Sequence, residues 1–534
     1  MTRWIIILSG PISSGKSTLA ELLAVRFNMK VVKTKQLLMS SLASKGETGG
    51  RISLQDEGDK LDKRTKGMWI ADELAKLVVN SGRDDSFIID SARIAEQVKA
   101  IRNAFPSVIH VHLKAPLTTL TSRYNKRIKN ETGAPSYDKV RENPTELNVG
   151  TMEEIADIVI DTDRCTSEDV FIRATSRMSL FSSRRGYVDV IVGGQYGSEG
   201  KGQIVDYLAD DYDIIVRVGG PNAGHTVPEG EGTFVYHMLP SGARTHQVHL
   251  VLGPGMVVNP IKLMEEIAKC NVDVSKLTID PNVMVITAKD VETEEKLVRD
   301  IGSTGSGVGA ATARRIMDRR LQGVKLARDI DELDPYTSRK AIDVLSEALA
   351  HNKRVLIEGT QGTGLSLYHG EYPHVTSRDT IVAGCLSEAG IAPMRVRRVI
   401  MVCRTYPIRV KNPEGGSSGR LSQEINWQII SKRSEIPLKE LEEHERGSTT
   451  GRLRRVGEFD WKLLQESSFL NGPTDIALTF ADYLSNKNAK AFRFDQLEPS
   501  TIQFIEEIER VSGAPVTLIA TGLGERHVID RRSW

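Results

Sequence analysis

The stretch VDVIVGGQYGSEGKGQIVD, residues 188–206, decides how the larger part of the chain folds. Its apolar beginning, VDVIV, is typical of a buried strand, which runs into a glycine-rich loop ending in Gly200-Lys201-Gly202. The backbone N–H groups of such a loop, with a lysine at its end, can bind phosphate. The chain begins with a second loop of this kind, GPISSGKST, residues 10–18. The sequence therefore predicts two separate phosphate sites.

The composition is that of a globular protein with more than one domain. A chain of 534 residues, 40% hydrophobic and 26% charged, is too long for a single core. Its net charge of +1 gives no overall field that would hold nucleic acid or a membrane. The four cysteines lie far apart, so we expect neither a disulfide framework nor a zinc site. Because no apolar run reaches the ~18 residues of a membrane helix, we expect a cytoplasmic protein.

Strand-like and helix-like segments alternate over residues 1–180. WIIILSG, MKVVKT, SFIIDSA and SVIHVHL are typical of strands, whereas residues 17–27 and 68–79 have helical apolar spacing. This alternation predicts a parallel sheet covered on both faces. After a polar linker, a new strand begins at Val188 and the same texture continues to the end. We therefore predict an α/β protein of two domains, 1–180 and 187–534, the second with a large central sheet.

The first loop fits the P-loop pattern G-x-x-x-x-G-K-[ST] and stands between a predicted strand and a predicted helix. The backbone around Gly10 and Gly15 would bind the phosphates, and Lys16 would reach the outer ones. Ser17 would hold Mg²⁺, with Thr18 next to it at the start of the helix. Residues 1–180 are therefore predicted to form a P-loop nucleotide-binding domain.

Further candidate residues lie at a strand end and on a helix of residues 1–180. Asp90 ends SFIID with Arg93 three residues on, and Arg123 and Arg127 lie on a helix after another strand. With the P-loop and the later segment ADIVIDTD, this arrangement resembles the nucleoside monophosphate kinases, whose lid arginines neutralise the transferring phosphoryl group. The resemblance implies a nucleotide kinase and leaves its acceptor open. Alternatively, the two later arginines form a solvated helix face and Asp90 caps its strand.

A series of motifs follows the second loop, in which Gly202 breaks the P-loop pattern. In order these are RVGGPNAGHT, GSTGSGVGAATARR, LIEGTQGTGLSLYHGEYPHVTS, GSTTGRLRRVGEFD, ALTFADYLS and FIEEIERVSGAPVTLIATG. Residues 187–534 thereby resemble the adenylosuccinate synthetases, especially the short archaeal and phage forms. The resemblance implies a homodimeric ligase that uses ATP or GTP with Mg²⁺ to phosphorylate the 6-oxygen of a purine nucleoside monophosphate. The amine of L-aspartate then displaces that phosphate.

The resemblance also implies residue roles. Lys201 and the amides around Gly200 would hold the transferring phosphoryl group. His225 would stabilise charge on the 6-oxygen, and the carbonyl of Gly224 would bind Mg²⁺. The positions that match contacts to the purine nucleotide, each of which could instead only stabilise its loop, are Asn222, Thr304, Gln361 and Thr376. Those that match contacts to the nucleoside triphosphate are Gly200, Gly202, Asp482 and Gly522.

The stretch STTGRLRR, residues 448–455, supplies two hydroxyls after its serine and three arginines. Such a set suits L-aspartate, because each substrate carboxylate can take a bidentate guanidinium partner. The positions that match the family's aspartate contacts are Thr450, Arg452 and Arg454. A plain basic surface run is the alternative.

One departure from the family concerns the reaction itself. The family reads G-D-E-G-K-G where this chain has Ser198, and the missing aspartate normally takes the N1 proton of hypoxanthine and binds Mg²⁺. A serine hydroxyl is too weak an acid to act as an anion near neutral pH. Guanine carries a 2-amino group beside N1, where a hydroxyl leaves room and still accepts a hydrogen bond. The same change marks the phage 2-aminoadenylosuccinate synthetases that act on dGMP.

The sequence therefore favours dGMP or GMP as the substrate of the second domain. IMP, with another residue as the base, and a non-catalytic nucleotide sensor are the alternatives. Other positions also depart from the family. Asp318 or its neighbour Arg319 stands where an arginine reaches the partner subunit, RVKNPEGGSSG replaces a glycine-rich segment at residues 409–419, and Phe480 replaces a lysine. The choice between ATP and GTP is left open.

Overall fold

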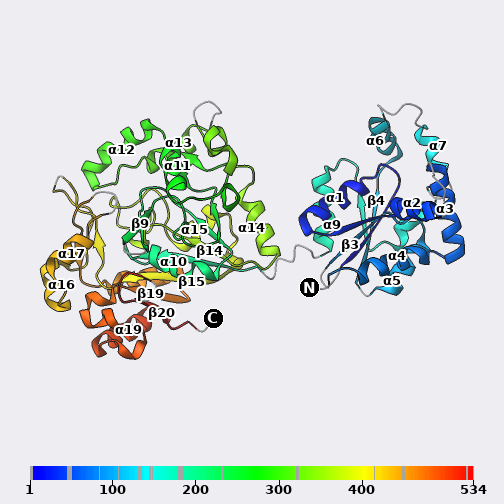
Figure 1. Cartoon of the computed structure of the whole chain (residues 1–534). Coiled ribbons are helices and arrows are strands. Elements are labelled where there is room, and N and C mark those ends of the chain that lie inside the picture. Colours follow the sequence, from blue (N-terminus) through cyan, green and yellow to red (C-terminus); the bar gives the residue numbers. More distant parts are fainter. Residues whose placement is uncertain are drawn as a thin grey trace. The chain divides into compact units, whose positions relative to one another are not determined.

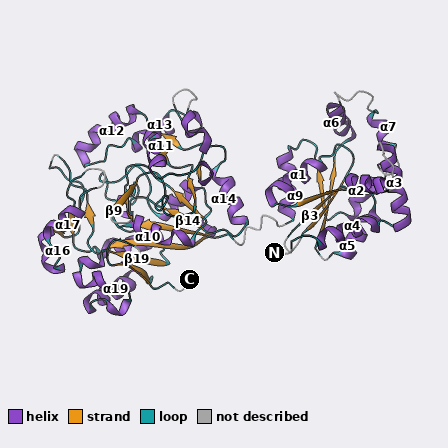
Figure 2. Cartoon of the chain, in the orientation of Figure 1, coloured by secondary structure: helices purple, strands orange, loops and turns teal. Residues whose placement is uncertain are grey.

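The computed structural model describes residues 4–44, 51–82, 85–105, 107–128, 135–142, 146, 148–178, 186–229, 232–319, 324–413, 415–447, 451–524 and 527–532. The chain divides into two compact units, Met1–Ser182 and Ser183–Trp534. Each unit has its own sheet, helices and hydrophobic core (Figures 1 and 2). Within the described ranges, no helix combines the length and apolar character needed to cross a bilayer.

The first unit is built on a five-stranded parallel sheet in the order β2-β3-β1-β4-β5. Its strands are β1 Ile5–Ser9, β2 Lys30–Lys33, β3 Phe87–Asp90, β4 Val108–Lys114 and β5 Ile158–Asp161. Its α-helices are α1 Lys16–Phe27, α2 Thr34–Ser44, α3 Arg51–Thr65, α4 Met68–Val79, α5 Ala95–Ala104, α6 Leu117–Ile128, α7 Tyr137–Arg141 and α9 Ser167–Arg177. The strands and helices predicted for this region are confirmed.

Both faces of this sheet are covered, because successive side chains of a strand point to opposite faces. Ile5 and Ile7 of β1 are buried with residues of α4 and α5. Ile6 and Leu8 are buried with residues of α1 and α9, which lie on the other side of the sheet (Figure 1). β1 lies between β3 and β4, so the loop that follows it stands at the middle of the sheet's carboxyl edge, where ligands of α/β proteins bind.

The second unit contains a nine-stranded sheet in the order β12-β10-β7-β14-β6-β15-β19-β20-β21. Only β21 runs antiparallel to its neighbour, so the sheet is mixed. Its strands are β6 Val188–Gly193, β7 Ile214–Arg217, β10 His249–Leu252, β12 Leu277–Ile279, β14 Val355–Glu358, β15 Val396–Arg404, β19 Asp475–Thr479, β20 Val516–Ala520 and β21 Val528–Asp530.

Smaller sheets and the helices complete the second unit. The short strands are β8 His225–Glu229, β9 Gly232–Tyr236, β11 Val257–Val258, β13 Met284–Val285, β16 Ile408–Arg409, β17 Glu424–Ile425 and β18 Arg455–Gly457. The α-helices are α10 Lys201–Leu208, α11 Pro260–Lys269, α12 Ala288–Ile301, α13 Val308–Met317, α14 Ala341–Ala350, α15 Val382–Ala389, α16 Trp427–Ser434, α17 Leu438–His444, α18 Trp461–Asn471 and α19 Pro499–Ser512.

The strand predicted to begin at Val188 is confirmed as β6, near the centre of the large sheet. It pairs with β14 on one side and β15 on the other. Val188, Val190 and Val192 are buried in the core of one face, and Ile191 is buried in the core of the other. The loop between β6 and α10 therefore lies at the carboxyl edge, between the ends of β14 and β15.

Candidate functional site

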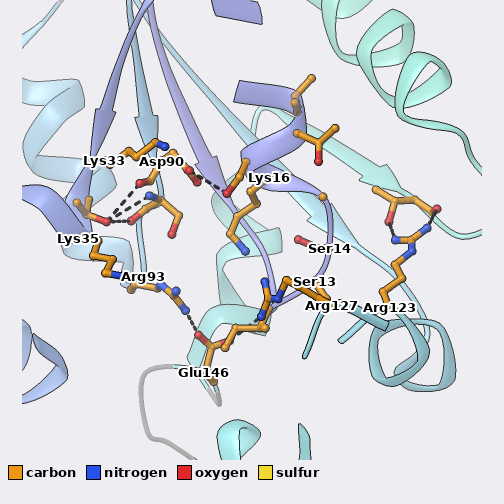
Figure 3. Close-up of a pocket in the computed structure, with 18 of the residues that line it drawn as sticks. Ser13, Ser14, Lys16, Lys33, Lys35, Asp90, Arg93, Arg123, Arg127 and Glu146 are labelled. Carbon is orange, nitrogen blue, oxygen red and sulfur yellow. Dashed lines mark hydrogen bonds and ion pairs between the residues drawn. The ribbon is translucent and has the colours of Figure 1, made fainter. Parts of the chain in front are cut away.

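The loop between β1 and α1 lines a pocket of about 1050 Å³ in the first unit. Nζ of Lys16 donates to the carbonyl oxygens of Gly10 at 2.7 Å and Pro11 at 2.8 Å. Oγ of Ser17 donates to Oδ2 of Asp90 at 3.0 Å, and Figure 3 shows Lys16 and Asp90 in this part of the pocket. The lysine therefore rests on its own loop, while a hydroxyl and a carboxylate meet next to it.

The predicted arginines line the same pocket (Figure 3). Arg123 donates to the hydroxyl of Thr162 at 2.9 Å and to its carbonyl at 2.7 Å, so it is held at the pocket and not on a free helix face. Arg127, with its guanidinium 5.3 Å from the ring centre of Tyr124, remains exposed. Burial and the charges of Arg93 and Arg127 lower the pKa of Lys16 to about 7.

Glu146 is a pocket residue that the sequence reasoning missed. Its carboxylate pairs with Arg93, as Figure 3 shows, and accepts a hydrogen bond from the backbone N–H of Ile12 at 3.3 Å. Loop amides and arginines bind phosphate oxygens in the same way, so the carboxylate marks an anion position. Around it, the hydroxyls of Ser13 and Ser14 are buried with no partner in the described part of the chain.

The loop between β6 and α10 is organised around Glu199. Its Oε1 accepts from the backbone N–H of Gln195 at 3.0 Å and of Gly197 at 2.7 Å. Its Oε2 lies 2.6 Å from Nζ of Lys201, and both side chains are buried. Ser198 stands between Gly197 and this pair. The lysine of the second loop is therefore neutralised inside the loop.

His225 lies beside this loop, because Gly202 in the first turn of α10 has no side chain and lets the His225 segment pack closely against the helix. A Cβ on Gly202 would come within 3.0 Å of Cβ of His225, so a glycine is needed there. Nδ1 of His225 lies 2.5 Å from Oε1 of Glu358, and a guanidinium nitrogen of Arg217 lies 2.6 Å from the same oxygen. Ser241 completes the shell of this carboxylate with its hydroxyl at 2.6 Å and its N–H at 2.9 Å.

Glu358 fixes the orientation of the imidazole. Burial, followed by the charge of Arg217, lowers the pKa of His225 to about 3. Burial acts to raise the pKa of Glu358, but Arg217 and His225 outweigh it and bring the value to about 2. The carboxylate is thus ionised and accepts the Nδ1 proton of a neutral ring. Nε2 is buried without a partner among the described residues, so it is available to a ligand.

Three of the four predicted purine-binding residues come together next to the second loop. The amide nitrogens of Gln361 and Asn222 lie 2.8 Å and 3.4 Å from Oγ1 of Thr376, to which they donate. The amide oxygens of both side chains have no partner in the described chain. Gly197 packs on the backbone of Gln361, where a Cβ would meet Cα at 3.0 Å. The fourth residue, Thr304, has its described side-chain contact with the neighbouring Ser306 instead.

The predicted aspartate residues lie in a loop after α17. Arg452 and Arg454 precede β18, and the carbonyl of Arg452 accepts from the N–H of Gly447 at 2.9 Å. Arg454 lies 3.5 Å from the carboxylate of Glu445. Thr450 lies outside the described residues. The structure therefore describes the two arginines and the base of this loop.

The remaining predicted residues lie around the start of α10, after β19 and after β20. Gly200 takes φ +82° at the first turn of α10. The carbonyl of Gly522 accepts from Nε2 of Gln203 at 2.7 Å. Burial raises the pKa of Asp482 to about 7, and one of its carboxyl oxygens has no partner in the described chain. Gly224 directly precedes His225.

The sequence reasoning missed several charged residues around these sites. Glu358, Arg217 and Arg404 are buried at the ends of the apolar strands VLIE, IIVR and VRRVIMVCR. A charged residue that ends a buried parallel strand points to the edge where ligands bind. That signal was present in the sequence and could have found all three. Glu445 has no such signal, because it ends a helix with three other acidic residues.

Two phosphate-binding loops, each at the carboxyl edge of its own sheet, define a nucleotide-binding α/β protein with two sites. Residues 190–334 and 324–489 match the adenylosuccinate synthetase family, and residues 6–165 match an AAA domain. The chain belongs to the adenylosuccinate synthetase family and carries a kinase-like P-loop domain before it. Its second unit is a ligase of the adenylosuccinate synthetase type.

Curated relatives align with the second unit over nearly their full length. The adenylosuccinate synthetase of Methanocaldococcus jannaschii is 38% identical over 353 residues, which are 64% of this chain and 96% of the relative. That of Thermococcus onnurineus is 40% identical over 352 residues, 64% of this chain and 98% of the relative.

Two solved structures share the fold of this unit. The succinoaminodeoxyadenylate synthetase of cyanophage S-2L, bound to dGMP and to dATP as an energy donor, has a TM-score of 0.55 and 28% identity, covering 66% of this chain and 97% of its own. The fully ligated adenylosuccinate synthetase of Plasmodium falciparum has a TM-score of 0.56 and 24% identity, covering 65% and 100%.

Proposed function

We propose that the second unit joins L-aspartate to C6 of dGMP or GMP, at the expense of a nucleoside triphosphate. The observation that carries this substrate is Ser198. It occupies a loop in which Gly197, Glu199 and Lys201 already have hydrogen-bond or ion-pair partners. The loop packs on Gln361, beside the other predicted purine-binding residues. A neutral hydroxyl there leaves room for a 2-amino group and accepts its hydrogen bond.

The enzyme of cyanophage S-2L supports this substrate, because it was solved with dGMP and is 28% identical to this chain. The intact surroundings of the site argue against a non-catalytic sensor. Lys201 keeps its ion pair with Glu199, and His225 keeps its contact with Glu358. A binding protein without chemistry has no need of a buried imidazole with a free nitrogen.

In the first step of the reaction, the terminal phosphoryl group of the triphosphate passes to the 6-oxygen of the purine, the nucleoside diphosphate leaves, and the N1 proton passes to water. Lys201 neutralises the charge of the phosphoryl group, exchanging the carboxylate of Glu199 for the phosphoryl oxygens. The negative charge of the nucleotide raises the proton affinity of His225, so that Nε2–H can donate to the 6-oxygen while Glu358 holds Nδ1. In the second step, Arg452 and Arg454 orient the carboxylates of L-aspartate for attack of its amine on C6.

The donor set of the first loop fits Mg²⁺. The hydroxyl of Ser17 and the carboxylate of Asp90 meet at 3.0 Å, and both are hard oxygen donors. In the second unit the carbonyl of Gly224 would be a ligand, as the family resemblance implies. The ion would neutralise charge on the triphosphate.

The test is release of phosphate by the purified chain with L-aspartate, Mg²⁺ and ATP or GTP, offering dGMP, GMP and IMP separately. We expect turnover with dGMP or GMP, and a product whose mass is that of the aspartate adduct. Turnover with IMP alone would overturn the substrate assignment and favour an AMP-pathway enzyme with a replacement base. Nucleotide binding without consumption of aspartate with any of the three would favour the sensor.

We further propose that the first unit is a nucleotide kinase. Its pocket combines the P-loop with Arg93, Arg123 and Arg127, which suits a phosphoryl group in transfer. Leu38, Met39, Leu54 and Trp69 also line the pocket and offer apolar and aromatic surface on which a purine or pyrimidine can pack. We expect phosphoryl transfer from ATP to at least one of GMP, dGMP, AMP or a diaminopurine nucleotide. No transfer to any of them would overturn the proposal.

We also propose that the chain forms a homodimer through its second unit, as the family resemblance implies. The mass in solution tests this directly, because one chain is 59.0 kDa. Light scattering coupled to size exclusion is expected to give twice that mass, and a monomeric mass at assay concentration would contradict it.

A further inference from the structure

Glu445, at the end of α17, is a buried carboxylate that no residue role assigned above accounts for. Its side chain is 2% exposed. Oε1 accepts from Nη2 of Arg404 at 2.7 Å and from the hydroxyl of Tyr483 at 3.0 Å. Oε2 lies 3.5 Å from Nη1 of Arg454. The two guanidiniums outweigh the effect of burial and lower the pKa of Glu445, so the carboxylate is ionised.

Each partner of Glu445 belongs to a different part of the ligase site. Arg404 donates to the carbonyl of Ser198 at 3.2 Å and so holds the second phosphate loop. Tyr483 follows the candidate triphosphate residue Asp482 in the chain. Arg454 is a candidate aspartate ligand. The carboxylate of Glu445 therefore contacts side chains from three segments of the ligase site: the end of β15, the segment after β19 and the predicted aspartate loop.

Glu445 also closes the base of the aspartate loop. Its carbonyl accepts from the N–H of Arg454 at 3.1 Å, and Arg446 pairs with Leu453 across the same loop. Glu445 and Arg454 are thus joined twice, by the contact between their side chains and by a backbone hydrogen bond. A change in the carboxylate therefore acts directly on Arg454, the candidate aspartate ligand.

Two guanidiniums contact Glu445 in this cluster, and Nε of Arg404 has no hydrogen-bond partner among the described residues. The guanidinium of Arg404 lies 4.0 Å from the ring centre of Phe480, and its charge also acts on Asp482. An arginine that is only partly paired with a carboxylate can bind a second one. Arg454, which is 18% exposed, is the member through which a substrate carboxylate can do so.

We propose that Glu445 is a positioning residue: it holds Arg454 for a carboxylate of L-aspartate and, through Arg404, ties that arrangement to the Ser198 loop. The inference rests on the proposed ligase function. It means that the aspartate site forms only when the second phosphate loop is in place. Glu445 itself touches no substrate.

The test is Glu445→Gln, which keeps the shape of the side chain and removes its charge. We expect KM for L-aspartate to rise about tenfold or more, because an uncharged partner no longer fixes Arg454. KM for the purine nucleotide and for the triphosphate is expected to change less than about twofold. Glu445→Asp, which restores the charge on a shorter side chain, is expected to recover part of the lost aspartate affinity.

Glu458→Gln is the matched control. It removes a carboxylate from an ion pair with Arg433 of 2.8 Å that is partly exposed to solvent, and it is expected to leave all KM values unchanged. A lower melting temperature of Glu445→Gln with KM for aspartate within about twofold of wild type would mean a purely structural role and overturn the inference. If Glu445→Gln does not fold, Tyr483→Phe removes the hydroxyl donor to Glu445. Its KM for aspartate must then rise, and an unchanged value would overturn the inference.

Calorimetric titration with L-aspartate in the presence of a purine nucleotide separates this inference from the proposed function, because it needs no turnover. Binding that wild type shows and Glu445→Gln loses supports the inference even if no purine nucleotide is converted. Equal binding by both proteins overturns it even if dGMP is converted at full rate.

Discussion

The two phosphate loops follow central strands of two sheets, one parallel and one mixed, but they hold their lysines in different ways. Lys16 rests on two carbonyl oxygens of its own loop, and the hydroxyls next to it have no partner in the described chain. Lys201 is paired with Glu199, whose other oxygen already satisfies two loop amides. The first loop therefore keeps the hydroxyls of Ser13 and Ser14 for a ligand and binds the carboxylate of Glu146 from another segment, whereas the second loop binds its own carboxylate.

This difference teaches what each loop is built to bind. A loop with unpaired hydroxyls and a lysine held on its own carbonyls suits the several oxygens of a triphosphate chain. In the second loop the lysine is already paired, and it can turn only to a charge that replaces Glu199. Such a loop suits one phosphoryl group in transfer rather than a whole triphosphate.

The largest expected effect comes from removing each lysine in turn, which tests whether the two loops act separately. Lys201→Ala is expected to lower ligase turnover about 10³-fold, because the transferring charge loses the buried cation of this loop. Lys16→Ala is expected to leave ligase turnover unchanged and to abolish phosphoryl transfer by the first unit. Both activities are measured on each variant. Loss of ligase turnover in Lys16→Ala would show that the loops do not act separately.

Glu358→Gln tests the role of His225, the histidine beside the second loop, by changing the carboxylate that contacts its Nδ1. The amide cannot hold the Nδ1 proton as firmly, and Arg217 is left without its ion pair. We expect kcat of the ligase to fall about 10- to 100-fold with KM for the nucleotides little changed. The first unit is the internal control. A fall in the activity of the first unit of the same size would point to general misfolding.

A smaller effect is expected on the affinity for the nucleoside triphosphate, which should depend on pH through Asp482, the residue predicted to contact its base. The pKa of Asp482 is about 7, and its carboxylate form accepts the N–H donors of guanine. If the second unit uses GTP, its affinity is expected to rise about tenfold from about pH 6 to 8, as the group ionises. If it uses ATP, affinity is expected to fall over that range, because a protonated carboxyl donates to N1 of adenine. Asp482→Asn should remove either dependence in calorimetric titrations.

The smallest expected effect is on the stability of the fold and concerns His246, which contacts α10, the helix that follows the second loop. His246 lies between Asp206 of α10 and Asp210, and its hydrogen bond to Asp206 is the main cause of a pKa raised to about 9. A raised histidine pKa stabilises the fold fully below the unfolded value of about 6.5 and no longer above about 9. His246→Gln should therefore lower the melting temperature at acid pH more than at alkaline pH. An equal loss at both would contradict the charged pair.

The sequence was sufficient for the fold class, the central strands and both phosphate loops. Those features depend on local apolar runs and glycine spacing, which neighbouring residues determine. It was also sufficient to name Asn222, Gln361 and Thr376, which the fold brings together. It could not give the partners that orient the site, such as Glu358 and Glu445, because strand order decides which distant residues meet. Their positions follow from β14 lying beside β6 and from α17 ending near β15.

The central claim is that Ser198 selects a 2-aminopurine nucleotide. It is tested most directly by competition: equal concentrations of dGMP and IMP, limiting ATP and saturating L-aspartate, with the two products separated by mass. For wild type we expect at least about tenfold more product from dGMP, and for Ser198→Asp a reversal toward IMP as the carboxylate crowds the 2-amino group and can take the N1 proton. Preference for IMP by wild type, or the same preference in both proteins, would contradict the account.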